Sequence, residues 1–311
     1  MSATTAEEEV SVEPRRGEGK RVVFVYDDEG VGPRSLEHTL HSLRQHLDLD
    51  RHEVRRIDSN RIKLQKEDDE ATLSWTSEAC LLVMPGGADR PYDHALRGAG
   101  NARIRAWVEA GGRYLGLCAG GYYGCARVEF EKGAAAGLEV CETRELAFYA
   151  GTARGPLVPP GQFDYATERG SRAARLDATQ LDPALAAVPV YYNGGCCFVG
   201  GGGADPACVA LAHYNGLSLD DEEDDGGGDG ADVARPVAIV SCAVGRGKAV
   251  LCGVHPEHDA RLLRAAHADD PHLARLFPAL EHGEPQRQRL FRSLLAHLGL
   301  QLAPPPGPDH C

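Results

Sequence analysis

The sequence predicts an α/β fold in which a mostly parallel central sheet is flanked by helices, and three observations support this. Two continuous runs of β-branched, aromatic and aliphatic residues, 22–26 and 80–84, are typical of strands buried on both faces of a parallel sheet. Between them, leucines at positions 36, 40, 43 and 47 recur at helical spacing, which indicates a crossover helix. Residues 113–125 then have the pattern of a strand, a sharp turn and a glycine-rich helix start.

The other elements follow from the same periodicities. After residue 125 the pattern becomes β-like and rich in Gly and Pro, which predicts a β-rich excursion with strands near 144–161 and 190–199. The remaining predictions, in chain order, are a strand at 52–57, a poorly defined polar segment at 58–79, a helix around Ile104, Trp107 and Val108, a strand at 114–117, a hairpin at 237–254 that turns at 245–248, and a closing helix at 286–298.

Length and composition predict a single domain spanning residues 20–302. The chain has 311 residues, of which 42% are apolar, enough for a large buried core. Residues 1–19, the acidic glycine-rich loop at 215–233 and the proline-rich tail at 303–311 lack apolar periodicity, and we expect them to be disordered. The net charge of −13 is concentrated in the tail and this loop, which argues against a nucleic-acid partner.

The sequence gives no sign of export, membrane insertion or metal binding. No apolar run approaches the roughly 20 residues of a membrane helix, and the N-terminus lacks the features of a signal peptide, so we expect a cytoplasmic protein. Its ten cysteines then favour reduced thiols, and none forms a C-x-x-C pair. The acidic run at 220–230 lacks the ligand spacing of a calcium loop. We therefore expect no metal and no cofactor.

The candidate reactive residue is Cys118, at the sharp turn between the strand at 114–117 and the helix start. Such a turn needs small neighbours, and Gly116, Ala119 and Gly120 supply them. A thiol at a helix N-terminus is favoured as thiolate, and the backbone N–H of Ala119 would serve as an oxyanion donor. The alternative is a buried structural cysteine in a glycine-rich turn.

Two further segments complete a candidate site. The loop after the strand at 80–84 contains Gly86 and Gly87 and offers a second oxyanion donor, although a plain glycine turn fits the same residues. His255 follows the strand at 249–254, and Glu257 lies two residues on, so the pair would serve as base and orienting carboxylate for a thiol nucleophile.

The order of these motifs resembles the class I glutamine amidotransferase-like fold, with its flavodoxin-like core, and more closely the N-terminal domain of eukaryotic biotin-protein ligases and its free-standing relatives. The segments that carry the resemblance are Met84-Pro-Gly-Gly-Ala-Asp-Arg-Pro-Tyr92, Gly116-Leu-Cys-Ala-Gly-Gly-Tyr-Tyr-Gly124, Arg144-Glu-Leu-Ala-Phe148 with Gly151-Thr-Ala-Arg-Gly-Pro156, Tyr191-Tyr-Asn-Gly-Gly195 and His255-Pro-Glu257.

The resemblance implies Cys118 as nucleophile, His255 as base and Glu257 as orienting group, with Gly87 and Ala119 as oxyanion donors. It also implies a set of pocket residues: Gly86, Tyr92, Gly120, Tyr122, Arg144, Glu145, Tyr192 and Asn193. No ligase domain and no Gly-Arg-Gly-Arg-Arg-Gly-like biotinyl-adenylate loop accompany these motifs, so we do not expect a biotin ligase.

Two functions remain open at this stage. The first is a thiol amidohydrolase or amidotransferase that acts on a small-molecule amide through a thioester, with a ligase or synthetase as a possible partner protein. The second is a catalytically silent module of the same fold that binds a small molecule or regulates a partner.

Overall fold

The computed structural model describes residues 20–64, 74–133, 138–159, 161–200, 207–216 and 235–304. Within these residues the strands form one large sheet: β1 Arg21–Tyr26, β2 His52–Ile57, β3 Ala79–Met84, β4 Arg113–Leu117, β5 Cys125–Phe130, β6 Val140–Thr143, β7 Tyr149–Gly155, β8 Ser171–Asp177, β9 Val188–Asn193, β10 Cys197–Val199, β11 Cys208–Gly216, β12 Val237–Val244 and β13 Gly247–Cys252. The helices are α1 Pro33–His46, α2 Ser59–Lys63, α3 Trp75–Glu78, α4 Asp89–Leu96, α5 Ala99–Glu109, α6 Ala119–Tyr123, α7 Ala260–Ala266, α8 Pro271–His282 and α9 Glu284–His297.

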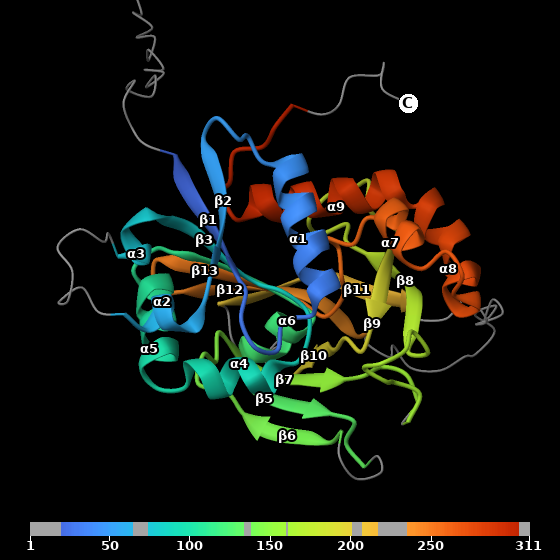
Figure 1. The fold of residues 1–311 in the computed structure, drawn as a ribbon, viewed down its shortest axis with the longest axis horizontal. Helices are drawn as coiled ribbons and strands as arrows, with labels where there is room; N and C mark the ends of the chain where they lie inside the picture. The colour runs from blue at the N-terminus through green and yellow to red at the C-terminus, as the bar shows by residue number, and fades with distance from the viewer. Residues whose placement is uncertain are drawn as a thin grey trace, which may run out of the picture.

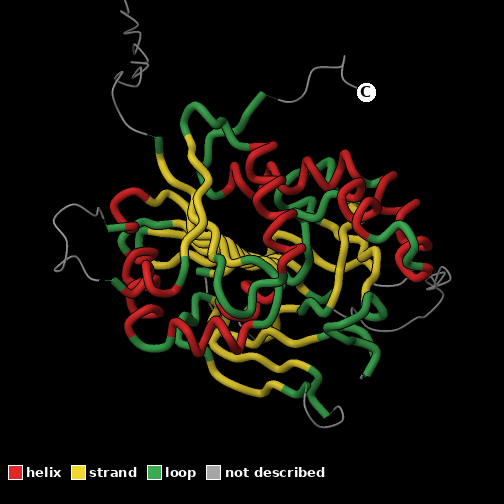
Figure 2. The backbone as a smooth tube through the Cα atoms, in the orientation of Figure 1, coloured by secondary structure: helices red, strands yellow, loops and turns green. Residues whose placement is uncertain are grey.

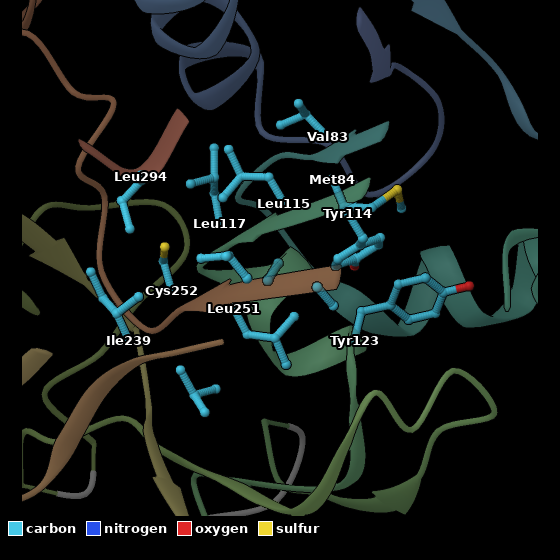
Figure 3. Packing of buried hydrophobic residues seen from close by; sticks show 14 of the residues in the cluster. Val83, Met84, Tyr114, Leu115, Leu117, Tyr123, Ile239, Leu251, Cys252 and Leu294 are labelled. Atoms are coloured by element: carbon cyan, nitrogen blue, oxygen red, sulfur yellow. The ribbon is translucent and has the colours of Figure 1, made fainter. Parts of the chain in front are cut away.

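The central part of the sheet is parallel, as predicted. Its strand order is β2-β1-β3-β4-β13, and every neighbouring pair in this run is parallel. Side chains on β4 alternate between the two faces: Leu115 and Leu117 point towards Leu294 of α9, whereas Tyr114 lies with Tyr123 on the other side (Figure 3). Both faces are therefore buried, which explains the unbroken apolar runs in the sequence.

The rest of the sheet is the β-rich excursion that the sequence predicts, and it is mainly antiparallel. The main path continues β13-β12-β10-β7-β5-β6, while β11 pairs with β12 and leads to β8 and β9. The prediction found β9 and the β12–β13 hairpin but missed β5, β6, β8 and β11. These strands contain charged or small residues, such as Arg127 and Glu129 in β5, so their apolar alternation is weak.

Helices cover the sheet from both sides. Figure 1 shows α1 and α9 on one side, with α7 and α8 beyond them, and α4 and α5 on the other. The tube view shows the same separation of helices around the strands (Figure 2). The short helix α6 lies against β4, β13 and β5, so it is held where the parallel and antiparallel parts meet. This places the turn before α6 at the carboxyl edge of the parallel strands.

Several sequence expectations concern residues outside the described ranges. Residues 1–19, 217–233 and 305–311 lie outside them, whereas residues 215 and 216 end β11. Among the described cysteines, Cys80, Cys118, Cys125, Cys141, Cys196, Cys197 and Cys252 are free thiols. No helix among the described residues is both long enough and apolar enough to span a bilayer.

Candidate active site

Cys118 lies at a strained turn between β4 and α6. Its φ of 49° is in the left-handed region, which a non-glycine residue adopts at a cost of about 1–3 kcal/mol. The turn is held by a hydrogen bond from Cys118 N to Cys252 O of 2.9 Å. A Cβ on Gly116 would lie 2.2 Å from Gly120 O, and one on Gly120 would lie 2.1 Å from Met84 O. The strands and the helix are therefore too close together for any side chain at these two positions. These contacts agree with the predicted nucleophile turn.

The environment of the Cys118 thiol differs in one respect from the expectation. The helix that follows, α6, is a single turn of five residues, so its dipole is a short one. The Cys118 side chain is only 5% exposed, and its Sγ lies 3.7 Å from Asn193 O, in the geometry of a weak S–H donor. A basic partner therefore has to supply most of the activation.

His255 is that partner. It follows β13 and is fixed by a backbone hydrogen bond of 3.0 Å from its N–H to Tyr191 O. Its Nδ1 lies 2.8 Å from Oε1 of Glu257, and both side chains are buried. Burial by itself lowers the pKa of His255, but the charges of Cys118 and Glu257 and hydrogen bonds with both raise it to about 10. The structure thus brings together all three residues of the predicted triad.

Gly86 lies against both reacting side chains. A Cβ at this position would be 2.5 Å from Cε1 of His255 and 3.4 Å from Cβ of Cys118. It would also be 2.6 Å from Oγ of Ser35 at the start of α1. Only a glycine fits here with the present side-chain positions, so the Pro-Gly-Gly loop is part of the site rather than a remote turn.

The two predicted oxyanion donors have free N–H groups. Among the described residues, neither Gly87 N nor Ala119 N has a hydrogen-bond acceptor. Gly87 has φ +148°, and a Cβ there would lie 2.0 Å from Gly30 O. The backbone of the loop before α1 therefore packs directly against Gly87. Ala119 directly follows Cys118 and Gly87 directly follows Gly86, so both N–H groups fit the predicted role of oxyanion donors.

Three of the predicted pocket residues are buried tyrosines, and their hydroxyl groups bond to the backbone of the surrounding loops. Tyr92 OH donates to Pro85 O and Gly86 O at 3.2 and 3.3 Å. Tyr122 OH bonds Gly194 O and Gly195 O at 3.1 and 2.9 Å, and Tyr192 OH also donates to Gly195 O at 2.9 Å. These phenols brace the loops that surround Cys118.

Arg144 and Glu145, predicted as pocket residues, make ion-pair and helix-end contacts. The buried Arg144 guanidinium donates from Nε to Asp89 Oδ2, the first residue of α4, at 2.8 Å. The exposed Glu145 accepts hydrogen bonds of 2.8 Å from Gly98 N and Asn101 Nδ2, so it caps the start of α5. These hydrogen bonds join Glu145 to the start of α5 and not to Cys118 or His255.

Asn193 contacts the site with its backbone and is held by its side chain. Its Nδ2 donates to Oε2 of Glu168 at 3.1 Å, and Glu168 is in turn ion-paired with Arg34 and hydrogen-bonded by Tyr191. Within the described residues its Oδ1 is buried without a partner. Sequence reasoning missed Glu168 and Arg34, because each is a lone charge in an unremarkable polar segment.

A second group that the sequence reasoning missed supports the His255–Glu257 segment from outside. Ser42 Oγ of α1 donates to Glu257 O at 2.7 Å. Arg287 of α9, which is buried, donates to Pro256 O at 2.6 Å and pairs with Glu284. One feature of the sequence could have pointed to this contact. Glu284 and Arg287 are three residues apart at the start of a helix whose buried face further on is apolar.

His258 adds an aromatic stack to this segment. Its ring lies parallel to His38 at 4.1 Å and to Tyr191 at 4.9 Å, between ring centroids. Burial lowers the pKa of His258 well below its usual value, so the ring is neutral at neutral pH. It therefore adds no positive charge next to His255.

His255, Glu257 and His258 offer three buried ligand atoms within 4.8 Å of one another, the spacing of a possible metal site. However, the Nδ1 to Oε1 distance of 2.8 Å between His255 and Glu257 is shorter than the roughly 3.3 Å that separates two ligands on tetrahedral zinc. This arrangement fits a shared proton better than a shared metal ion.

The fold and the site define an α/β protein with a Cys-His-Glu arrangement at the carboxyl edge of a parallel sheet. A family model described as "Biotin-protein ligase, N terminal" matches residues 21–308, and the chain belongs to this family. The resemblance seen in the sequence motifs is therefore confirmed.

Two relatives of this chain differ in how much of their own length the match covers. An uncharacterized protein of Chlamydia muridarum is 35% identical over 236 residues, which are 76% of this chain and 80% of that protein. A biotin–protein ligase of Schizosaccharomyces pombe is 31% identical over 238 residues, which are 76% of this chain but 33% of the ligase. The matched region thus spans about a third of that ligase.

Solved structures are similar at a greater distance. The PurLQS structure from Thermotoga maritima aligns over 90% of this chain and 100% of its own, with 16% identity and a TM-score of 0.48. A glutamine amidotransferase from the same organism aligns over 90% and 99%, with 12% identity and a TM-score of 0.47.

Proposed function

We propose that this protein is a thiol-dependent amidohydrolase or amidotransferase that acts on a small-molecule amide. The observation that carries the proposal is the contact set around Gly86: a Cβ there would lie 2.5 Å from Cε1 of His255 and 3.4 Å from Cβ of Cys118, and His255 Nδ1 lies 2.8 Å from Oε1 of Glu257. A thiol, a base and an orienting carboxylate in this order have the roles of a nucleophilic triad.

Each group has a defined task in the proposed reaction. His255 takes the proton of Cys118, and the Cys118 sulfur attacks the amide carbonyl to form a C–S bond. The N–H groups of Gly87 and Ala119 stabilise the oxyanion that develops. His255 returns its proton to the leaving amine as the C–N bond breaks, which leaves a thioester, and water or an acceptor amine then releases the acyl group with His255 as base. Glu257 holds the imidazole in position throughout.

The proposal is tested by covalent labelling with an electrophilic glutamine analogue and by turnover of a panel of small amides. Labelling located by peptide mass spectrometry should fall on Cys118, and it should be lost in Cys118→Ser and strongly slowed in His255→Asn. Cys141→Ser is the matched control, because Cys141 is partly exposed and lies on β6. Labelling that persists unchanged in His255→Asn would refute the triad.

A second function is supported by the enclosure of the thiol. Cys118 is 5% exposed, and Tyr92, Tyr122 and Tyr192 fill the space around its loops. These observations favour a module that binds a ligand or regulates a partner without turnover. The two functions are separated by the same experiment: a binding module would leave Cys118 no more reactive than its neighbours, and no amide in the panel would be consumed.

We also propose a partner and a location. Because a relative of this chain forms about a third of a biotin–protein ligase, a ligase or synthetase is the partner class to test, by binding measurements between purified proteins. Failure of every such pair to associate at micromolar concentration would count against it. The free thiols of Cys80, Cys125 and Cys252 support a cytoplasmic location, which localisation of a tagged chain would check.

A further inference from the structure

The end of strand β9 contributes two backbone carbonyls to the thiol site. Asn193 O accepts the weak S–H hydrogen bond of Cys118 at 3.7 Å. Tyr191 O accepts a hydrogen bond of 3.0 Å from the N–H of His255, and the two rings pack against each other with 5.7 Å between their centroids. The position of this strand end therefore determines where the nucleophile and its base lie.

Sheet pairing by itself holds this strand end at one side only. Among the described strands, β9 pairs with β8 alone, in an antiparallel register that extends to Asn193, and the chain turns away at Gly194 with φ +69° (Figure 1). An edge strand has one row of backbone groups without a sheet partner, and strand ends open more readily than strand centres. The place of Tyr191 and Asn193 therefore depends on contacts outside the sheet.

Glu168 supplies these contacts from the turn before β8. Side chains 191 and 193 project from the same face of β9, because side chains alternate along a strand. Oε2 of Glu168 accepts a hydrogen bond of 3.1 Å from Asn193 Nδ2 and another from the Tyr191 hydroxyl. The Glu168 carbonyl in turn accepts from N and Oγ of Ser171 at 2.9 and 2.7 Å. One carboxylate, in a residue that is 4% exposed, thus holds both residues of the strand end.

An ion pair joins Glu168 to helix α1, which also borders the site. Oε1 of Glu168 pairs with Arg34 in the first turn of α1, and the Arg34 guanidinium also contacts His267. The same end of α1 is bonded to the Pro-Gly-Gly loop, because Gly32 N donates to Gly86 O at 3.0 Å. The Arg34 side chain is 41% exposed, so the buried carboxylate has its counter-charge without a second buried charge. Glu168 therefore connects β9 with the helix that holds the Gly86 loop.

We propose that Glu168 is a positioning residue of the thiol site, which keeps the nucleophile and its base in place by holding the end of β9. This inference rests on the proposed thiol chemistry and adds to it a residue that acts through its neighbours. The hold depends on the acceptor oxygen of Glu168, because Tyr191 and Asn193 both donate to it as neutral groups. A misplacement of about 1 Å slows a catalytic step about 10²-fold, so the loss of both hydrogen bonds should be measurable at the thiol.

The test compares Glu168→Leu, which removes the acceptor, with Glu168→Gln, which keeps an acceptor oxygen for both donors. The readouts are carbamidomethylation of Cys118 by iodoacetamide, with the partly exposed Cys141 as internal reference, and hydrogen exchange of the His255 backbone N–H. Glu168→Leu should slow Cys118 and speed this exchange by about tenfold or more each, and Glu168→Gln should restore most of both. An unchanged rate of either kind in Glu168→Leu, or no restoration by Glu168→Gln, would overturn the proposal.

A matched control separates positioning from a general loss of stability. Asp93 of α4 is likewise buried, at 2%, and is ion-paired with the exposed Arg97. Asp93→Leu should lower the free energy of unfolding and leave the alkylation of Cys118 in the folded protein unchanged. If Asp93→Leu slows Cys118 as much as Glu168→Leu does, Glu168 has only a structural role.

The route through β9 is tested by combining variants. Tyr191→Phe together with Asn193→Ala should slow Cys118 as much as Glu168→Leu does, and adding Glu168→Leu to this pair should slow it by less than about twofold more, since residues of one network are not additive. Additive effects would contradict the route. If Cys118 of the wild type reacts no faster than Cys141, the proposed function fails, whereas a fast Cys118 that is indifferent to Glu168→Leu refutes the positioning role alone.

Discussion

Replacing Gly86 by alanine tests whether the close approach of Cys118 and His255 is functional. The new Cβ would lie 2.5 Å from Cε1 of His255 and 2.6 Å from Oγ of Ser35, so it is blocked on both sides. Carbon atoms in contact are about 3.5–4.0 Å apart, which means that the His255 ring has to move by roughly 1 Å. A misplacement of that size costs about 10²-fold in a catalytic step.

The same displacement should be visible in the chemistry of the thiol. A His255 ring displaced by about 1 Å is badly placed to take the Cys118 proton, so we expect Gly86→Ala to slow alkylation by iodoacetamide by up to about 10²-fold. Overpacking should also lower the free energy of unfolding by about 1–3 kcal/mol.

The assay is the rate of carbamidomethylation of Cys118 at pH 7, read by peptide mass spectrometry. The partly buried Cys80 is an internal reference, since burial raises its pKa to about 11. The matched control is Gly32→Ala, because Gly32 donates to Gly86 O and a Cβ on it would make only ordinary contacts of 3.4–3.8 Å. If folded Gly86→Ala protein reacts as fast as the wild type and Gly32→Ala, the reasoning is refuted.

Three other predictions concern groups around the site. His255 has a folded-state pKa of about 10, above its ordinary 6.5, so its stabilisation is complete below pH 6.5 and is lost as pH rises through 10. We expect the wild type to lose stability relative to His255→Asn over this range, by up to about 1.4 kcal/mol per pH unit, in urea unfolding; parallel pH profiles would contradict this. Arg287→Gln leaves a buried partner carboxylate unpaired and should cost about 3–5 kcal/mol in chemical denaturation, whereas the exposed Arg264→Gln should have a much smaller effect; equal losses would disprove the role of burial. Glu145→Ala should lower the thermal midpoint slightly, by the loss of a helix cap worth about 1 kcal/mol or less, and leave the alkylation of Cys118 unchanged; a slowed alkylation would instead place Glu145 in the pocket.

Local sequence patterns were sufficient for the parallel core and for the turn at Cys118. β1 and β3 are buried on both faces, so their residues had to be continuously apolar, and this is visible without a structure. The turn between β4 and α6 was equally visible, because close packing of strand and helix demands the glycines at 116 and 120. In both cases the constraint acts on neighbouring residues in the chain.

Antiparallel strands at the edge of the pattern were not predictable in the same way. β5 carries Arg127 and Glu129: Arg127 pairs with Glu129, and Glu129 pairs also with Lys132 and with Arg154 of β7. Since such pairing depends on β7 lying alongside, the apolar alternation that marks a strand is absent from β5 itself. Helix α4 also depends on a distant segment, because its first residue, Asp89, is ion-paired with Arg144, which follows β6.

The sequence by itself determined which residues would have the chemistry of a site: a cysteine at a strained turn, a Pro-Gly-Gly loop and a histidine two residues before a glutamate. Only the tertiary structure decided that Cys118 and His255 both lie against Gly86, that Glu257 bonds His255, and that Glu145 caps a helix. The physical reason is that residue type and strain are local properties of the chain. The pairing of a buried charge or donor, in contrast, depends on which distant segments the sheet brings to the same edge.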